Sequence, residues 1–233
     1  MSAASQLTRQ HLDKIRGFYD EAPATTSVEG RYYRSWLARY YNLYLPAGAS
    51  VLEIGCGSGE LLAQLRAGRK VGVDLSAVQL AAARARVPDA EFQLAAGEDL
   101  PLTEKFDCII ISDTLNLAAD VQQLLERLHQ VCHADTRLII NYYSSLWRPL
   151  LAVGGWLGLR SPQPQYSWLS NDDVRNLNTG VVDVILRLHA MTARFQHADE
   201  RVAERRVAQV PDVRGFVRID VGMFDDDFFA GFG

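Results

Sequence analysis

The chain begins with two amphipathic segments, after which short apolar runs and longer amphipathic runs follow one another. Residues 7–19 and 32–44 both have hydrophobic positions three and four residues apart, which is typical of helices. The second segment carries a stripe of large side chains at these spacings: Tyr32, Tyr33, Trp36, Leu37, Tyr40, Tyr41 and Tyr44. We expect most of this stripe to pack on a sheet, and the Pro-Ala-Gly turn at 46–48 to end the helix.

From residue 50 onward the pattern predicts strands interleaved with helices. The expected strands are 50–54, 70–74, 91–94, 106–111 and 136–141, and the expected helices are 60–67, 76–86 and 121–132. This order is typical of an α/β fold with a mostly parallel sheet and helices on both faces. Ligands of such sheets bind at the carboxyl ends of the strands, so the loops at that edge should carry the function.

The first strand ends in an acid and three glycines at alternate positions: Glu53, Gly55, Gly57 and Gly59, with Cys56 between the first two glycines. Gly55 and Gly57 can take backbone angles closed to other residues and let a ligand lie against the main chain. The spacing differs from the G-x-G-x-x-G of dinucleotide sites. Glu53 would repel a pyrophosphate, whereas it suits a ligand that carries an ammonium and a sulfonium. Asp74 ends the second strand and should lie beside this turn.

These residues, with the run 71–76 (Val-Gly-Val-Asp-Leu-Ser), strongly resemble motifs I and II of class I S-adenosylmethionine-dependent methyltransferases. The resemblance covers about residues 7–177. It implies a Rossmann-like, doubly wound, mostly parallel seven-stranded sheet, S-adenosyl-L-methionine as cofactor, and methyl transfer as the activity. In that family the position of Asp74 accepts hydrogen bonds from the ribose hydroxyls. The implied cofactor-binding residues are Glu53, Gly55, Cys56, Gly57, Gly59, Asp74, Leu75, Gly97 and Glu98.

One part of the cofactor site departs from the family pattern. Residues 95–101 resemble the segment that flanks adenine, but the family's aspartate falls on Ala96 when the segment is aligned on Leu100 and Pro101. Glu98 or Asp99 are the alternatives for contacting the adenine amino group, and backbone groups at 96–98 are a third.

The catalytic residues are expected after the fourth and fifth strands. Asp113 lies in the loop that in this family is next to the transferred methyl, and Tyr142 and Tyr143 follow the fifth strand. The alternative roles are a helix cap for Asp113 and packing for the tyrosines. His129 and His133 are expected on one helix, far from the cofactor edge, and receive no role. No metal site is predicted.

The domain organisation follows from this arrangement. Residues 1–45 are expected to form N-terminal helices that cap the cleft, and 46–233 a methyltransferase domain. The aromatic-rich stretch 142–170 is expected either as a lid over the acceptor pocket or as a core helix. Residues 178–233 depart from the usual ending of the family, which is an antiparallel pair of strands, and 215–221 is a candidate for the last strand.

The amino-acid composition limits the classes of function that fit this chain. A chain of 233 residues with 48% apolar content is typical of one domain, and a net charge of −4 disfavours nucleic acid as partner. The three cysteines have no metal-binding spacing, and neither a secretory signal nor a transmembrane segment is evident, so we expect a cytoplasmic protein.

The acceptor is expected to be a small molecule, a glycan or a lipid-like compound. Segments 31–33, 147–150 and 167–170 look like bacterial methyltransferases found beside or fused to sugar-transfer enzymes, which implies a glycan or lipid-linked sugar. Two alternatives remain. A non-catalytic cofactor-binding module is favoured by Ala96 and by the unusual C-terminal region, and a nucleotide-dependent oxidoreductase is disfavoured by the glycine spacing and Glu53.

Overall fold

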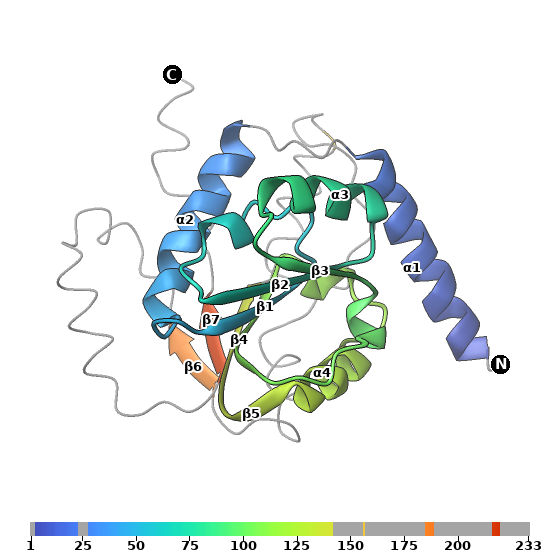
Figure 1. The fold of residues 1–233 in the computed structure, drawn as a ribbon. Helices are drawn as coiled ribbons and strands as arrows, with labels where there is room; N and C mark the ends of the chain where they lie inside the picture. Colours follow the sequence, from blue (N-terminus) through green and yellow to red (C-terminus); the bar gives the residue numbers. More distant parts are fainter. Residues whose placement is uncertain (1–2, 23–27, 142–155, 157–184, 189–215, 220–233) are drawn as a thin grey trace.

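A parallel β-sheet forms the centre of the protein (Figure 1). The computed structural model describes residues 3–22, 28–141, 156, 185–188 and 216–219. Five parallel strands form the main body of the sheet in the order β3-β2-β1-β4-β5; they are β1 (Ser50–Ile54), β2 (Arg69–Asp74), β3 (Glu91–Leu94), β4 (Phe106–Ser112) and β5 (Cys132–Asn141). The predicted α/β, Rossmann-like fold class is confirmed.

The register of the central strands brings their carboxyl ends together. Ile54 of β1 is opposite Val73 of β2 and Ile111 of β4. The next residues, Gly55, Asp74 and Ser112, therefore lie level with one another at one edge. β2 and β3 follow β1 on one side of the sheet, and β4 and β5 lie on the other side, so the strand order reverses at β1. Open α/β sheets bind their ligands beside such a point.

Two short strands lie beyond β5. β7 (Phe216–Ile219) pairs with β5, and β6 (Ile185–Leu188) pairs with β7, both in parallel. The antiparallel terminal pair implied by the resemblance is thus not what these residues form, although the segment 215–221 does contain a strand.

Helices cover both faces of the sheet. α2 (Val28–Tyr44) packs on one face, where Leu37 and Tyr41 are fully buried against β1, β4 and β5. α4 (Val121–Gln130) packs on the other face through Leu124, Leu125 and Leu128. α3 (Ala77–Arg86) lies on the same side as α2, and α1 (Ala3–Glu21) runs beside α3 at the edge of the domain (Figure 1). Among the described residues, no helix combines the length and apolar character needed to cross a membrane.

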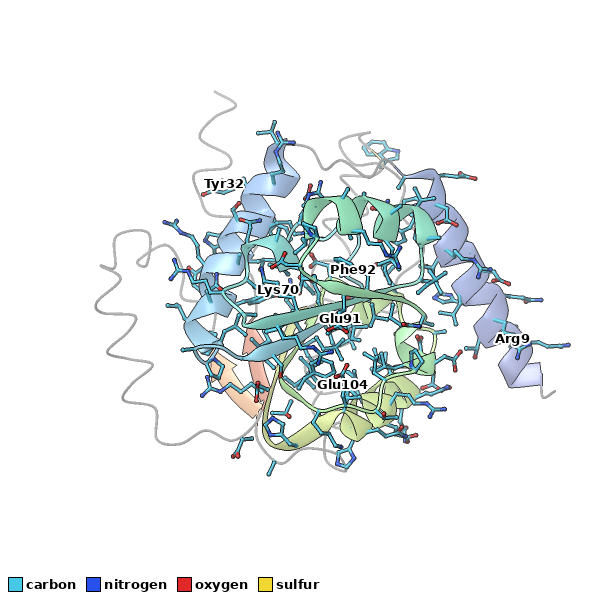
Figure 2. All side chains as sticks on the ribbon, in the orientation of Figure 1. Arg9, Tyr32, Lys70, Glu91, Phe92 and Glu104 are labelled. Atoms are coloured by element: carbon cyan, nitrogen blue, oxygen red, sulfur yellow. The ribbon has the colours of Figure 1, made fainter. Side chains whose placement is uncertain are left out.

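The aromatic stripe of α2 is mostly, but not wholly, a packing surface. Tyr41 is buried, and Tyr33, Trp36, Tyr40 and Tyr44 pack against the same cluster. Tyr32 is 75% exposed and lies on the outer side of α2 (Figure 2).

The helix predicted over 60–67 does not form. The segment contains only the 3-10 turn η1 (Leu62–Gln64), after which Leu65 is extended. The segment is instead bonded to α2: the side chain of Asn42 accepts a hydrogen bond from the Arg66 backbone N–H at 2.7 Å and donates one to the Gln64 carbonyl at 3.0 Å. Backbone groups that a longer helix would use are thereby taken by a neighbouring helix.

The predicted helix over 121–132 is too long. α4 ends at Gln130, and β5 already begins at Cys132 rather than at residue 136. His133 therefore lies in a strand and not on the helix of His129, and its Nε2 is 3.2 Å from Oδ1 of Asp107.

Candidate functional site

A cavity of about 270 Å³ opens at the carboxyl ends of β1, β2 and β4. Its walls are the glycine turn, the end of β2, the segment around the 3-10 turn η2 (Gly97–Asp99), the end of β4, and one side of α1. Most of the predicted site residues line it: Glu53, Gly55, Cys56, Gly57, Asp74, Leu75, Gly97, Glu98 and Asp113. Gly59 does not line the cavity, and Tyr142 and Tyr143 lie outside the described residues.

The three glycines of the turn have different functions. All have positive φ, of +73° at Gly55, +51° at Gly57 and +74° at Gly59. A Cβ at Gly55 would be 2.1 Å from Thr114 Oγ1, and one at Gly59 would be 3.2 Å from Ala83 Cβ. A Cβ at Gly57 would meet no atom within 4 Å. Gly55 and Gly59 thus allow the turn to pack, while Gly57 exposes main chain to the cavity.

Asp74 is held by the glycine turn and by the start of α3. Its Oδ2 accepts a 2.7 Å hydrogen bond from the Gly57 amide, and its Oδ1 accepts a 2.8 Å hydrogen bond from the Ser76 amide. Burial raises the pKa of this carboxyl, and the backbone amides lower it in part. Because a carboxylate oxygen has more than one acceptor site, both oxygens keep capacity for a pair of ligand hydroxyls.

Glu53 is the most deeply buried acid of the cavity wall. It is 2% exposed, and its Oε2 has no hydrogen-bond partner among the described residues. Burial raises the pKa of Glu53 to about 8, although the positive charge of Arg34 lowers it in part. A buried polar atom without a partner is rare in native proteins and requires an explanation. A ligand that brings a cationic donor into the cavity would provide the partner.

In the segment that flanks the predicted adenine site, Glu98 makes hydrogen bonds within the protein. Oε1 of Glu98 accepts a 2.8 Å hydrogen bond from the Ala119 amide, and its carbonyl accepts one from the side chain of Gln123 at 3.2 Å. One oxygen of Glu98, which was one of the alternatives for the missing aspartate, is therefore committed to the segment before α4. Asp99 is exposed, and Ala96 lines the cavity.

A polar cluster surrounds Asp113, the predicted catalytic acid. Its Oδ1 accepts hydrogen bonds of 2.9 Å from the Tyr33 hydroxyl and from the Asn141 side chain. Its Oδ2 accepts one of 2.9 Å from Nη1 of Arg34. Asp113 is also the one described non-glycine residue with positive φ, at 57°, and its amide is held by Asn141 Oδ1 at 2.8 Å.

Sequence reasoning missed Arg34 and Asn141 and assigned Tyr33 to packing. Residues 34, 37, 38 and 41 share one face of α2, and the last three are buried. A charged residue on that apolar face was the signal that could have revealed Arg34.

The first helix forms part of the cavity wall. Leu12, Ile15, Arg16, Tyr19 and Ala22 all line it. At one end α1 is attached to α3, because Ser76 Oγ donates to Asp20 at 2.5 Å and the Gln79 side chain donates to the carbonyls of Tyr19 and Ala22. Further along α1, the His11 ring is hydrogen-bonded to the Leu117 carbonyl at 3.0 Å. α1 thus contributes side chains to the cavity wall and is hydrogen-bonded to the rest of the domain at two places.

Residues 52–140 match a protein-family model described as a methyltransferase domain. An uncharacterized methyltransferase of Synechocystis is 33% identical to this chain over 158 residues, which cover 64% of the chain and 73% of that protein. The chain belongs to the class I S-adenosylmethionine-dependent methyltransferases. S-adenosyl-L-methionine is the methyl donor of this family, and the open glycine turn, Asp74 and the unpaired Glu53 oxygen fit such a cofactor.

Other relatives agree with this family assignment. The ubiquinone biosynthesis O-methyltransferase of Nitrobacter winogradskyi is 37% identical over 129 residues, covering 53% of this chain and 48% of that enzyme. The chain spans about half or less of the length of several curated relatives that it matches. The PH0226 protein of Pyrococcus horikoshii shares the fold, with a TM-score of 0.58, 20% identity, and coverage of 72% of this chain and 90% of that one.

Proposed function

We propose that this methyltransferase transfers the methyl group of S-adenosyl-L-methionine to a small-molecule, glycan or lipid-like acceptor, using the cavity at the glycine turn. The observation that carries the proposal is the meeting of Gly57, Asp74 and Glu53 around one cavity. When bound, the cofactor supplies a methyl group on an already activated sulfonium. Positioning of donor and acceptor then supplies much of the acceleration.

Different residues would bind different parts of the cofactor. Asp74 would accept the ribose hydroxyls, and the main chain at Gly57 would lie against the ligand. Glu53 would accept the ammonium group through its unpaired Oε2. Backbone groups at 96–98 would contact the adenine, since Glu98 is partly committed to Ala119. Asp113, Tyr142 and Tyr143 are the proposed catalytic residues, with 142–170 as a lid; of that stretch the structure describes Trp156 alone, which is 86% exposed.

The names of relatives favour acceptors that are not nucleic acids. They include a demethylmenaquinone methyltransferase, a trans-aconitate 2-methyltransferase, the ubiquinone O-methyltransferase and a ribosomal protein L11 methyltransferase. We propose a small apolar or lipid-like acceptor for this chain, because the net charge of −4 and the aromatic content of 142–170 fit such a compound. A lipid-linked sugar is included on the local likeness of segments 31–33, 147–150 and 167–170 to the sugar-associated enzymes.

A non-catalytic cofactor-binding module is the second candidate, and Ala96 in place of the usual aspartate favours it. The family assignment removes the third, a nucleotide-dependent oxidoreductase. Incubation with methyl-labelled S-adenosylmethionine and separate pools of quinone precursors, small carboxylic acids and lipid-linked sugars distinguishes the first two. Our proposal expects label to enter one pool together with S-adenosylhomocysteine release. Tight S-adenosylhomocysteine binding with no labelled product in any pool would favour the binding module.

A further inference from the structure

The glycine turn is attached to two neighbouring elements. Its first half, residues 55–57, is hydrogen-bonded through its backbone amides to the end of β2. Its second half, residues 58–60, contacts the last turn of α3. Gly59 lies so close to α3 that a Cβ there would be 3.2 Å from the Cβ of Ala83. The shape of the second half of the turn therefore depends on α3.

Arg86, at the end of α3, contacts both ends of this second half. Its Nη1 donates a hydrogen bond to the Ser58 carbonyl, and its Nη2 is 3.5 Å from Oε1 of Glu60. Glu60 lines the cavity, and its side chain is 11% exposed. A guanidinium presents its donors in a rigid planar fork. Two contacts from one guanidinium therefore fix the Ser58 carbonyl and the Glu60 side chain relative to each other.

The segment after the turn explains why such a contact matters. The predicted helix over 60–67 is replaced by η1, which is three residues long. In a helix that began directly after the turn, the Ser58 carbonyl would accept a hydrogen bond from the backbone amide four residues further on. The Arg86 guanidinium supplies a donor to this carbonyl instead. A side chain of α3 thus takes a part that a helix backbone would otherwise have.

We propose that Arg86 is a positioning residue of the cofactor site, which holds Ser58 and Glu60 so that the turn has its ligand-binding shape before the ligand arrives. This inference rests on the proposed function, because it takes the turn as the place where the cofactor binds. The described lining of the cavity includes Glu60 but not Arg86, so Arg86 acts through the turn. A site that is already ordered binds more tightly, because less conformational freedom is lost on binding.

Cys56 can report on the state of the turn. It lies between Gly55 and Gly57, it is 5% exposed, and it lines the cavity. Burial raises the pKa of its thiol well above the ordinary value, so an alkylating reagent should react with it slowly while the turn keeps its shape. Cys108 is fully buried in β4 and should react only when the sheet itself unfolds.

Alkylation of the ligand-free protein with iodoacetamide, followed for each cysteine by mass spectrometry, tests the contact. Arg86→Met should raise the rate at Cys56 about three- to tenfold and leave the rate at Cys108 unchanged, because a partly exposed charge-assisted contact is lost. Arg84→Met removes an equal charge from the same helix, where the side chain donates to the Phe92 carbonyl, and should not raise the rate at Cys56. Arg86→Lys keeps a charged donor and should recover part of the protection.

Calorimetry with S-adenosylhomocysteine connects the turn to the cofactor. Arg86→Met should bind this ligand about three- to tenfold more weakly, because the turn must be ordered on binding, whereas Arg84→Met should bind it with unchanged affinity. Saturating S-adenosylhomocysteine should protect Cys56 from alkylation both in the wild type and in Arg86→Met.

Three results would overturn the inference while leaving the proposed function intact. They are an unchanged rate at Cys56 in Arg86→Met, an equal rise at Cys56 and Cys108, which would mean a general loss of stability, and a raised rate at Cys56 with unchanged affinity for S-adenosylhomocysteine. Failure of the wild type to bind S-adenosylhomocysteine would instead overturn the proposed function and the positioning role with it, whatever the alkylation rates. If Arg86→Met folds poorly, Arg86→Lys compared with Arg84→Lys tests the same contact.

Discussion

The backbone amide of Gly57 donates a 2.7 Å hydrogen bond to the carboxylate of Asp74. Together with the Gly55 and Cys56 amides, which donate to the Val73 carbonyl, this contact joins the turn after β1 to the end of β2, so the two motifs form one structural unit. The same carboxylate also fixes the first turn of α3 through the Ser76 amide. Asp74 therefore positions the cavity wall on which it would bind a ligand.

Replacing Asp74 should weaken the cofactor strongly. Asp74→Ala removes the proposed acceptor for the ribose hydroxyls, and charge-assisted hydrogen bonds of this kind contribute about 1.5–3 kcal/mol each. Since about 1.4 kcal/mol corresponds to a factor of ten, S-adenosylhomocysteine should bind at least about tenfold more weakly by calorimetry. Asp89→Ala, at an exposed loop position, is the matched control. Equal affinities in the two variants would exclude Asp74 from the site.

A bulky residue at Gly57 should abolish binding without unfolding the protein. A side chain there would enter the cavity, because a Cβ meets nothing within 4 Å and Gly57 lines the cavity. Gly48 has a similar φ of +72° and equally open surroundings but does not line the cavity. Gly57→Leu and Gly48→Leu should therefore lose similar stability, about 1–2 kcal/mol for a side chain at such a φ.

Comparing these two glycine variants separates the effect on ligand binding from the effect on stability. By calorimetry, Gly57→Leu should show no measurable binding of S-adenosylhomocysteine, and Gly48→Leu should bind it with unchanged affinity. Thermal unfolding of both checks that the strain is matched. Normal binding by Gly57→Leu would mean that the ligand does not approach the turn.

Glu53 should make both stability and cofactor binding depend on pH. Its folded pKa of about 8 lies above the ordinary 4.5, so between these values the native state holds a proton that the unfolded state has lost. Stability of the ligand-free protein should fall as pH rises through this window, and Glu53→Gln should remove that dependence. Glu126→Gln, at an exposed position of α4, should leave the pH dependence of stability unchanged. Melting temperatures of the three proteins, measured at intervals of about one pH unit from pH 5 to pH 8, test this prediction.

The same carboxyl links binding to proton release. A cationic cofactor favours the ionised form of Glu53, so affinity for S-adenosylmethionine should rise as pH increases toward 8 in the wild type. Calorimetry in two buffers of different ionisation enthalpy should detect a released proton, which should be absent in Glu53→Gln. Affinity that falls over this range, or an identical proton release in the variant, would contradict the assignment.

The aromatic segment after β5 is predicted to serve the acceptor rather than the cofactor. Tyr143→Ala and Trp147→Ala should reduce turnover more than they reduce S-adenosylhomocysteine affinity, because in the proposed function the acceptor and the cofactor occupy different halves of the cleft. Steady-state kinetics alongside calorimetry makes the comparison. A lower melting temperature with normal specific activity would assign these side chains to the core.

The local elements could be predicted because their signals are local. The apolar runs before Gly55 and Asp74 gave β1 and β2 nearly to the residue. The segment 60–67 has good helix-forming residues, yet Asn42 of α2 takes the backbone groups of Gln64 and Arg66, and no local pattern encodes that contact.

The same distinction applies to the site. Glu53, Gly57 and Asp74 lie within one strand-turn-strand stretch, and their spacing alone indicated a shared site. The partners of Asp113 are 79, 80 and 28 residues away along the chain, at Arg34, Tyr33 and Asn141. Only the packing of α2 over the ends of β4 and β5 brings them together, so the sequence indicated Asp113 but not the group that it holds.

The most direct test of the cofactor assignment is a calorimetric titration of the wild-type protein with S-adenosylhomocysteine and, separately, with NAD. We predict saturable binding of one S-adenosylhomocysteine per chain, displaced by S-adenosylmethionine, and no heat of binding with NAD. Saturable binding of NAD without binding of S-adenosylhomocysteine would contradict the account at its centre, because the glycine turn, Glu53 and Asp74 would then serve a different ligand.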